Sequence, residues 1–133
     1  MSEPSERDKL LHYLFTTALE GGIVYWSQCS RYHWMIGPPA HDVERPSEED
    51  WRGFYAEIVE VGDGDDEEPH RIDRSVVSRG LRLAAMEPWR NKIRWSSGEK
   101  PPLVVTDDTD WDFDAGDADM IVQLGLFGEV VYG

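Results

Sequence analysis

The sequence predicts an α+β fold, with a small, mainly antiparallel sheet packed against about three helices in a single domain over residues 1–133. Segments with helical apolar spacing alternate with short β-branched and aromatic runs, without the regular strand–helix–strand spacing of a parallel sheet. The length of 133 residues is close to that of one domain, and a content of 11% aromatic residues argues against a disordered chain.

The N-terminal segment predicts a helix over residues 5–20. Ser5 is a good N-cap, and Asp8 follows it three residues later, as in a capping box. Gly21 and Gly22 then supply a C-terminal stop. Helical spacing is shown by Leu10, Leu11, Leu14, Phe15, Ala18 and Leu19.

Four short runs have the β-branched and aromatic composition of strands. The first two are 23–26, which could instead begin a second helix, and 32–36. A third strand is predicted over 54–61 and a return strand over 70–72. The acidic run 62–68 between them predicts a mobile hairpin tip or a disordered loop, because like charges repel and two glycines add freedom.

The middle of the chain predicts a second helix that begins at Asp73 or Ser75 and ends before Pro88. The sequence of residues 89–100 does not favour one type of secondary structure. The short apolar run 103–105 is a strand candidate.

The last predicted helix begins at Asp114, with Asp117 three residues on, and ends near Gly128. Residues 129–132 are candidates for a final edge strand. Helical spacing is shown by Ala118, Ile121, Val122, Leu124, Gly125 and Leu126.

The formal net charge of −14, from 27 acids and 13 bases, restricts the class of partner. Such a chain repels nucleic-acid phosphates and anionic membranes, and attracts a basic protein surface; simple solubility is the alternative explanation. The single cysteine, Cys29, cannot form an internal disulfide, and no apolar run approaches the ~20 residues of a membrane-spanning helix. We therefore expect a cytoplasmic protein.

The charges are segregated along the chain. Residues 71–100 carry net +5, whereas residues 101–133 carry eight acids and no lysine or arginine. Two interpretations stay open. The acidic loop 107–114 packs near the arginines of the middle helix, or an acidic face meets a partner.

Alternating aspartates raise the question of a metal site. Asp110, Asp112 and Asp114 would point to one side of an extended loop, but an EF-hand requires Gly and Glu where Ala115 and Ile121 stand. A solvated loop followed by a helix cap is therefore favoured, and no cofactor is predicted.

Several single residues have a predicted role or location that follows from their position in the predicted elements. Glu20 opposes the helix dipole at the end of the first helix, which makes it the candidate for a catalytic carboxylate, although pairing with an arginine is the favoured alternative. His12 is predicted at the helix surface and Cys29 in the core. Six tryptophans are more than one small core can bury, which favours a binding surface.

Two segments carry a resemblance to known proteins: Thr17–Ile23 with Tyr25, Trp26 and Ser27, and Asp114–Gly133. On them the chain resembles a group of small proteins encoded by tailed bacteriophages and prophages, especially those of actinobacteria. The resemblance implies a phage origin and action in the host bacterial cytoplasm, and it assigns no catalytic residue.

Three functional hypotheses follow. The first is an accessory protein that binds and modulates a host protein with a basic surface, by mimicry of nucleic-acid charge. Its candidate contact residues are Asp107, Asp108, Asp110, Trp111 and Asp112. The second is a small metal-dependent enzyme acting on nucleotides through Glu20 and the aspartates of 107–119. The third is a virion assembly protein; the oligomeric state stays open.

Overall fold

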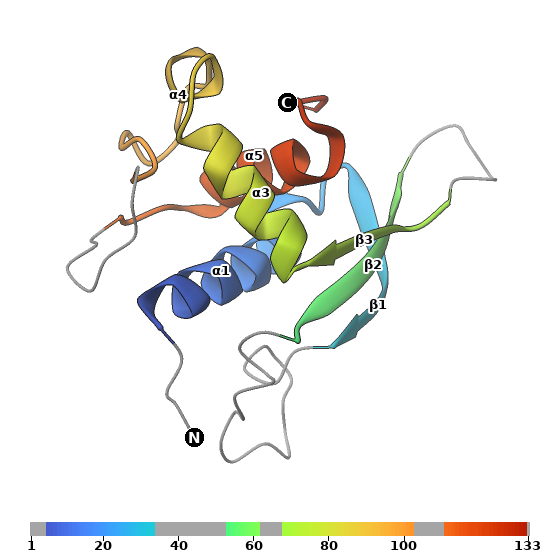
Figure 1. The fold of residues 1–133 in the computed structure, drawn as a ribbon. Coiled ribbons are helices and arrows are strands. Elements are labelled where there is room, and N and C mark those ends of the chain that lie inside the picture. The colour runs from blue at the N-terminus through green and yellow to red at the C-terminus, as the bar shows by residue number, and fades with distance from the viewer. Residues whose placement is uncertain (1–4, 34–52, 62–67, 103–110, 133) are drawn as a thin grey trace.

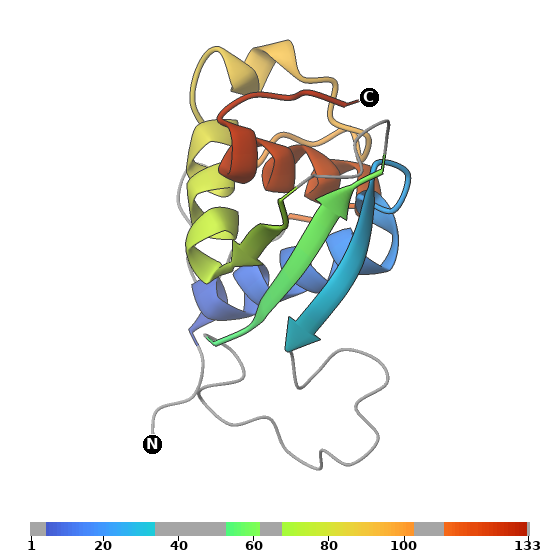
Figure 2. The ribbon, with the colours of Figure 1, turned by 90° about the vertical axis from the view of Figure 1, so that its right-hand side faces the viewer.

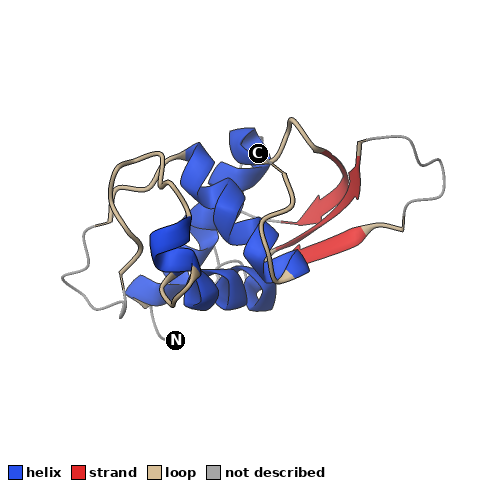
Figure 3. Cartoon of the chain, turned by 90° about the horizontal axis from the view of Figure 1, so that it is seen from above, coloured by secondary structure: helices blue, strands red, loops and turns tan. Residues whose placement is uncertain are grey.

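The structure is a computed structural model that describes residues 5–33, 53–61, 68–102 and 111–132. Its elements in chain order are α1 (Glu6–Thr17), the π-helical turn η1 (Ala18–Gly22), β1 (Ser27–His33), β2 (Tyr55–Glu60), β3 (His70–Asp73), α3 (Arg74–Ala84), α4 (Trp89–Lys92) and α5 (Ala115–Phe127). The helices gather on one side of a three-stranded antiparallel sheet (Figures 1 and 3). The predicted α+β class is confirmed.

The first helix begins as predicted. The Ser5 hydroxyl accepts a hydrogen bond from the Asp8 amide at 3.1 Å, and the Asp8 carboxylate accepts one from the Ser5 amide at 3.3 Å. Asp8 also accepts a 2.7 Å ion-pair contact from Arg74, which ties α1 to α3. At its other end the helix widens into η1. There Gly22 leaves no room for a side chain, because an added Cβ would lie 2.5 Å from the carbonyl oxygen of Ala115.

The sheet has the order β1–β2–β3, and the predicted hairpin of β2 with β3 is confirmed. The strand predicted at 23–26 is wrong, whereas the one predicted at 32–36 overlaps the end of β1 at residues 32–33, and its residues 34–36 lie outside the described residues. Residues 23–26 form a turn, and β1 begins at Ser27 on a mostly polar stretch. The physical reason is that Ile23 and Trp26 reach the core from the turn, whereas β1 lies at an edge of the sheet with its residues 28–32 exposed.

The helices α3 and α5 approach each other through glycines. A Cβ added to Gly80 would lie 1.9 Å from the carbonyl oxygen of Ile121, and one added to Gly125 would lie 2.0 Å from that of Val76. Larger side chains at either position would push the two helices apart. This contact places α5 in the centre of the molecule (Figure 2).

The helices of the second half of the chain begin and end close to the predicted capping residues. Asp73 rather than Ser75 caps α3, and α3 ends at Ala84, before Pro88. Asp114 and Asp117 form a capping box on α5, and Gly128 ends it at a φ of 73°. The strand candidate 103–105 and the acidic run 62–67 lie outside the described residues.

The final edge strand predicted for 129–132 is wrong. Residues 130–132 run as an extended tail outside the sheet and pass over the end of α5 (Figure 2). Their backbone groups bond to a side chain rather than to a strand, as described below.

Two single-residue predictions are also wrong. His12 is fully buried rather than on the surface, because Phe54 packs edge-on against its ring at 5.4 Å. Cys29 is exposed rather than buried, since it lies on the edge strand β1. Among the described tryptophans, Trp26, Trp95 and Trp111 are buried.

In the ranges that the structure covers, no helix combines the length and the apolar character needed to cross a membrane.

Candidate functional site

The most unusual group in the described structure is the carboxylate of Asp119, which is buried in the middle of α5. One of its oxygens accepts hydrogen bonds at 2.8 Å from both the Trp26 indole and the Gln123 amide. The other accepts one at 2.6 Å from the Tyr25 hydroxyl. Burial raises the pKa of Asp119, and the three donors partly offset this rise because they favour the ionised form.

Tyr25 connects this carboxylate to the surface. Its ring is half-exposed, while its hydroxyl points inward and donates to Asp119. The pKa of Tyr25 is raised, first by desolvation and then by the bond to Asp119 and the negative charge there. Tyr25 therefore stays a neutral phenol that donates one hydrogen bond.

Gln123, one helical turn after Asp119, holds the C-terminal tail. Its side-chain oxygen accepts the backbone amides of Val131 at 2.8 Å and Tyr132 at 2.7 Å. Its nitrogen donates to Asp119 and to the Tyr132 carbonyl oxygen at 3.1 Å. The amide thus takes the place of a neighbouring strand, because it satisfies backbone groups that a sheet would otherwise pair.

The tail in turn covers Trp26. The rings of Trp26 and Tyr132 stack with centroids 4.9 Å apart and planes 6° from parallel. The Tyr132 hydroxyl bonds to Glu60, whose other oxygen lies 3.0 Å from His70 Nε2. The network therefore runs from α5 through the tail to β2 and β3.

A second buried carboxylate, Asp117, has different partners. It accepts the backbone amides of Ser96 at 2.8 Å, Ser97 at 3.3 Å and Asp114 at 3.2 Å. These bonds dock the turn at 95–98 onto the first turn of α5. The neighbouring Asp114 has a lowered pKa, chiefly because the Ser96 hydroxyl donates to it.

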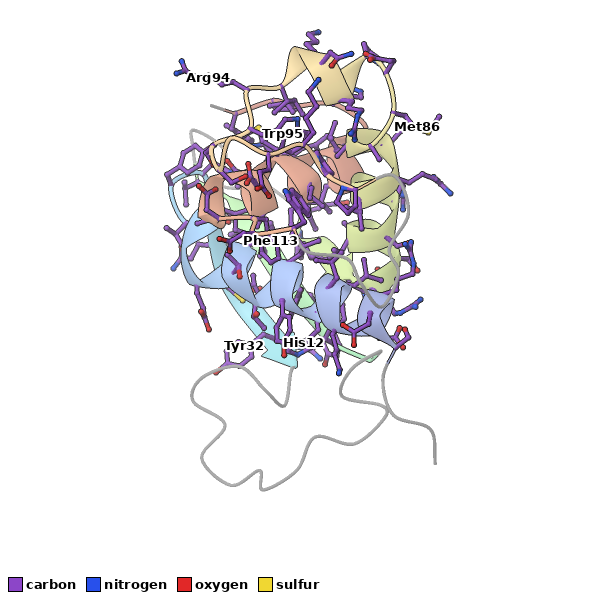
Figure 4. The ribbon with its side chains drawn as sticks, turned by 90° about the vertical axis from the view of Figure 1, so that its left-hand side faces the viewer. His12, Tyr32, Met86, Arg94, Trp95 and Phe113 are labelled. Carbon is purple, nitrogen blue, oxygen red and sulfur yellow. The ribbon has the colours of Figure 1, made fainter. Side chains whose placement is uncertain are left out.

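The candidate contact residues are only partly described. Asp107, Asp108 and Asp110 lie outside the described residues. Asp112 is exposed, whereas Trp111 is buried, with its ring edge-on to Trp95 at 6.3 Å and its indole nitrogen 3.3 Å from the Glu99 carbonyl oxygen. Figure 4 shows Trp95 and Phe113, the two aromatic neighbours of Trp111, on this side of the molecule.

The other carboxylates that were candidates for catalysis or metal binding have different surroundings in the structure. Glu20 is exposed on η1, and Asp114 caps α5. Within the described ranges, no three His, Cys, Asp or Glu side chains are grouped as a metal site would require. Of the candidate metal ligands, Asp112 and Asp114 fall in those ranges.

The charge segregation has a structural counterpart in α5. Asp114 and Asp117 reach into the basic segment 71–100, but they bind serine and backbone groups there. Arg74, at the start of α3, pairs with Asp8 of α1 instead. The hypothesis that the acidic loop packs near those arginines depends on residues outside the described ranges.

Sequence reasoning missed the network around Asp119 and Gln123. The available signal was an acid and an amide four residues apart on a helix that is apolar nearly all round. Polar groups in such a helix need partners when they are buried. The two segments that carry the phage resemblance meet here, at Tyr25, Trp26 and Asp119.

Comparison with protein families, with curated proteins and with solved structures gives no match for this chain.

Proposed function

We propose that the chain is a phage-encoded acidic accessory protein that acts in the host bacterial cytoplasm and binds a basic surface of a host protein. A groove that otherwise holds nucleic-acid phosphates is the partner surface that best matches its charge. The phage origin follows from the resemblance alone, and the binding role follows from the charge.

One observation carries the proposal: most of the surplus negative charge of the sequence falls in a few short acidic stretches, such as 62–68 and 107–110. The described residues contain 14 acids and 11 bases, a net charge of −3, against −14 for the whole chain. The remaining ranges therefore carry net −11. An excess of this size is far more than the net charge of the described residues could balance.

The three buried acids of the described residues are engaged in internal contacts, which leaves the attraction of a partner to other acids. Asp8 pairs with Arg74, Asp117 binds backbone amides, and Asp119 binds three side-chain donors. Long-range attraction of a basic partner depends on the summed charge and raises the rate of encounter. The surplus acids are therefore the natural source of that attraction.

The test is affinity capture of the tagged full chain from nuclease-treated host lysate, with bound proteins identified by mass spectrometry. We expect one stoichiometric partner with a basic groove, whose binding weakens as salt is raised. Two charge-matched variants localise the effect. One replaces Asp107, Asp108, Asp110 and Asp112 by Asn, and the other neutralises Asp63, Asp65, Asp66 and Glu67.

At least one of the two variants should weaken binding strongly. A partner that is retained at high salt by both variants would contradict the proposal, and so would empty captures from several host lysates.

A further inference from the structure

The tail at 130–132 lies on the rest of the molecule in the way that an extended peptide lies on a receptor. It belongs to no strand, and the groups that hold it are side chains from α5, from the turn after η1 and from the end of β2 (Figure 2). Val130 and Tyr132 pack against the core, whereas Val131 between them is exposed. This alternation is that of an extended segment with one side on a surface.

One side-chain amide binds the backbone of the tail. Gln123 accepts the amides of Val131 and Tyr132 at 2.8 and 2.7 Å, and it donates to the Tyr132 carbonyl oxygen at 3.1 Å. A strand that is added to a sheet edge makes bonds of the same kind, and they do not depend on which side chains the added segment carries. Gln123 therefore recognises an extended backbone with two successive free amides.

Two further contacts recognise the side chain at position 132. The rings of Tyr132 and Trp26 stack with centroids 4.9 Å apart, and the ring of Phe127 lies edge-on at 6.4 Å from that of Tyr132. The Tyr132 hydroxyl bonds to Glu60. An alanine at this position would lose the ring contacts, and a phenylalanine would lose the bond to the carboxylate. Together the contacts select a tyrosine.

The groups that bind the tail are held in place by contacts that do not involve the tail. Asp119 accepts both the Trp26 indole and the Gln123 amide at 2.8 Å. Glu60 lies on β2, with one oxygen 3.0 Å from His70 Nε2 on β3. A receptor that is ordered in advance loses little conformational entropy when a segment binds.

The connection between α5 and the tail allows the tail to leave without unfolding the helix. Gly128 ends α5 at a φ of 73°, and its amide donates to the Leu124 carbonyl oxygen at 2.9 Å. This cap precedes the tail, and both Gly128 and Glu129 are exposed. Detachment of the tail therefore breaks its contacts with Gln123, Trp26 and Glu60 and leaves the cap of α5 intact.

We propose that Trp26, Gln123 and Glu60 form a binding site for an extended protein segment that carries a tyrosine, and that the tail occupies this site in cis. A tyrosine-containing segment of another protein binds there when the tail gives way. The chemistry of the occupant is that of the segment which the structure shows in the site. The site involves none of the acidic stretches, so it is independent of the proposed function.

The covalent connection makes the tail a strong competitor. A segment joined by a short flexible link has an effective concentration of about 1 mM. A partner segment that makes the same contacts at micromolar concentration is therefore excluded from the unmodified protein. Weakening the tail without changing the residues that bind it should open the site.

The experiment uses the full chain with the substitutions Val131→Pro and Tyr132→Ala. They remove an amide that Gln123 accepts and the ring that stacks on Trp26. A synthetic peptide of the sequence Glu-Val-Val-Tyr-Gly is titrated in, and NMR follows the Trp26 indole N–H and the Gln123 side-chain amide. We expect saturable shifts toward the resonance positions of the unmodified protein, which itself should bind the peptide at least about tenfold more weakly.

Two control peptides test the two kinds of contact. Replacing the tyrosine of the peptide by alanine removes the ring stack, and methylating its amide nitrogen removes a bond to Gln123. Each change should weaken binding to the double variant about tenfold. The single variant Tyr132→Ala keeps the backbone bonds of the tail, so its affinity for the tyrosine peptide should lie between those of the double variant and the unmodified protein.

Three outcomes would overturn the inference. The first is that the peptide leaves the Trp26 and Gln123 resonances of both variants unmoved up to about 1 mM. The second is equal binding of the tyrosine and alanine peptides, and the third is a set of shifts confined to other residues. If the double variant does not fold, Tyr132→Ala decides by the same criteria. Capture of a salt-sensitive basic partner tests the proposed function separately.

Discussion

Two aspartates of α5, only two residues apart, are both buried, yet they are satisfied in opposite ways. Asp117 receives backbone amides on both of its oxygens. Asp119 receives only side-chain donors, and one of them, the Tyr25 hydroxyl, can also accept a hydrogen bond. The first contact therefore fixes the path of the chain, whereas the second fixes side chains under an exposed surface.

The largest effect is expected from Asp119→Ala. It leaves the buried donors of Trp26 and Gln123 without their acceptor, and each such donor costs about 1–3 kcal/mol. We expect a loss of about 4 kcal/mol in the free energy of unfolding, measured by urea denaturation. A loss below about 1 kcal/mol would show that these donors find other acceptors.

The amide replacements come next and distinguish the two sites. Asp119→Asn can keep its oxygen on Trp26 and Gln123 and turn its NH₂ toward the Tyr25 oxygen, so it should cost about 1 kcal/mol or less. In Asp117→Asn, the side-chain NH₂ must face a backbone N–H that is also a donor, so the free energy of unfolding should fall by about 2 kcal/mol. Equal losses in urea denaturation would contradict the assigned difference between the two carboxylates.

Lowering the pH should change the contributions of Asp114 and Asp119 to the free energy of unfolding in opposite directions. The pKa of Asp114 is lowered by folding, so its contribution to stability is present above the ordinary value of 3.8 and is lost as the pH falls through the folded pKa. The pKa of Asp119 is raised, so its contribution is full below 3.8 and is lost as the pH rises through the folded pKa.

Urea denaturation of the protein and of the variants Asp114→Asn and Asp119→Asn, from neutral to acid pH, measures both contributions. The stability advantage of Asp114 over its variant should shrink on acidification, while that of Asp119 should grow. Parallel curves would contradict the assigned directions of the two pKa shifts.

The smallest effect is expected from Tyr25→Phe. It removes one donor from Asp119 but keeps the half-exposed ring, so we expect a loss of about 1 kcal/mol or less. Because the other two donors remain, Asp119 should keep its place, and the indole NH resonance of Trp26 should hardly move. Loss of that hydrogen-bonded resonance would show that Tyr25 organises the whole network.

The helices were predictable because their signals are local. Ser5 with Asp8, and Asp114 with Asp117, are capping pairs within one turn, and Gly128 supplies the left-handed residue that ends α5. The hairpin of β2 with β3 was predictable from its apolar runs and the acidic, glycine-containing segment between them.

The strand at 27–33 and the tail at 130–132 could not be predicted in this way. β1 is an edge strand with polar residues, so it lacks the apolar alternation that marks a half-buried strand. The tail has strand composition, but the side chain of Gln123, nine residues before Tyr132, takes the backbone bonds that a sheet would have made.

By itself the sequence determined the class of the fold, the capped helices and the strong negative charge, because these depend on composition and on neighbours within a few residues. Only the tertiary structure decided that Trp111 is buried and that Asp119 is held by Tyr25 and Trp26. The second of these features joins segments more than 90 residues apart, Tyr25 and Trp26 with Asp119. Contacts at that separation depend on how the elements pack, which no local pattern records.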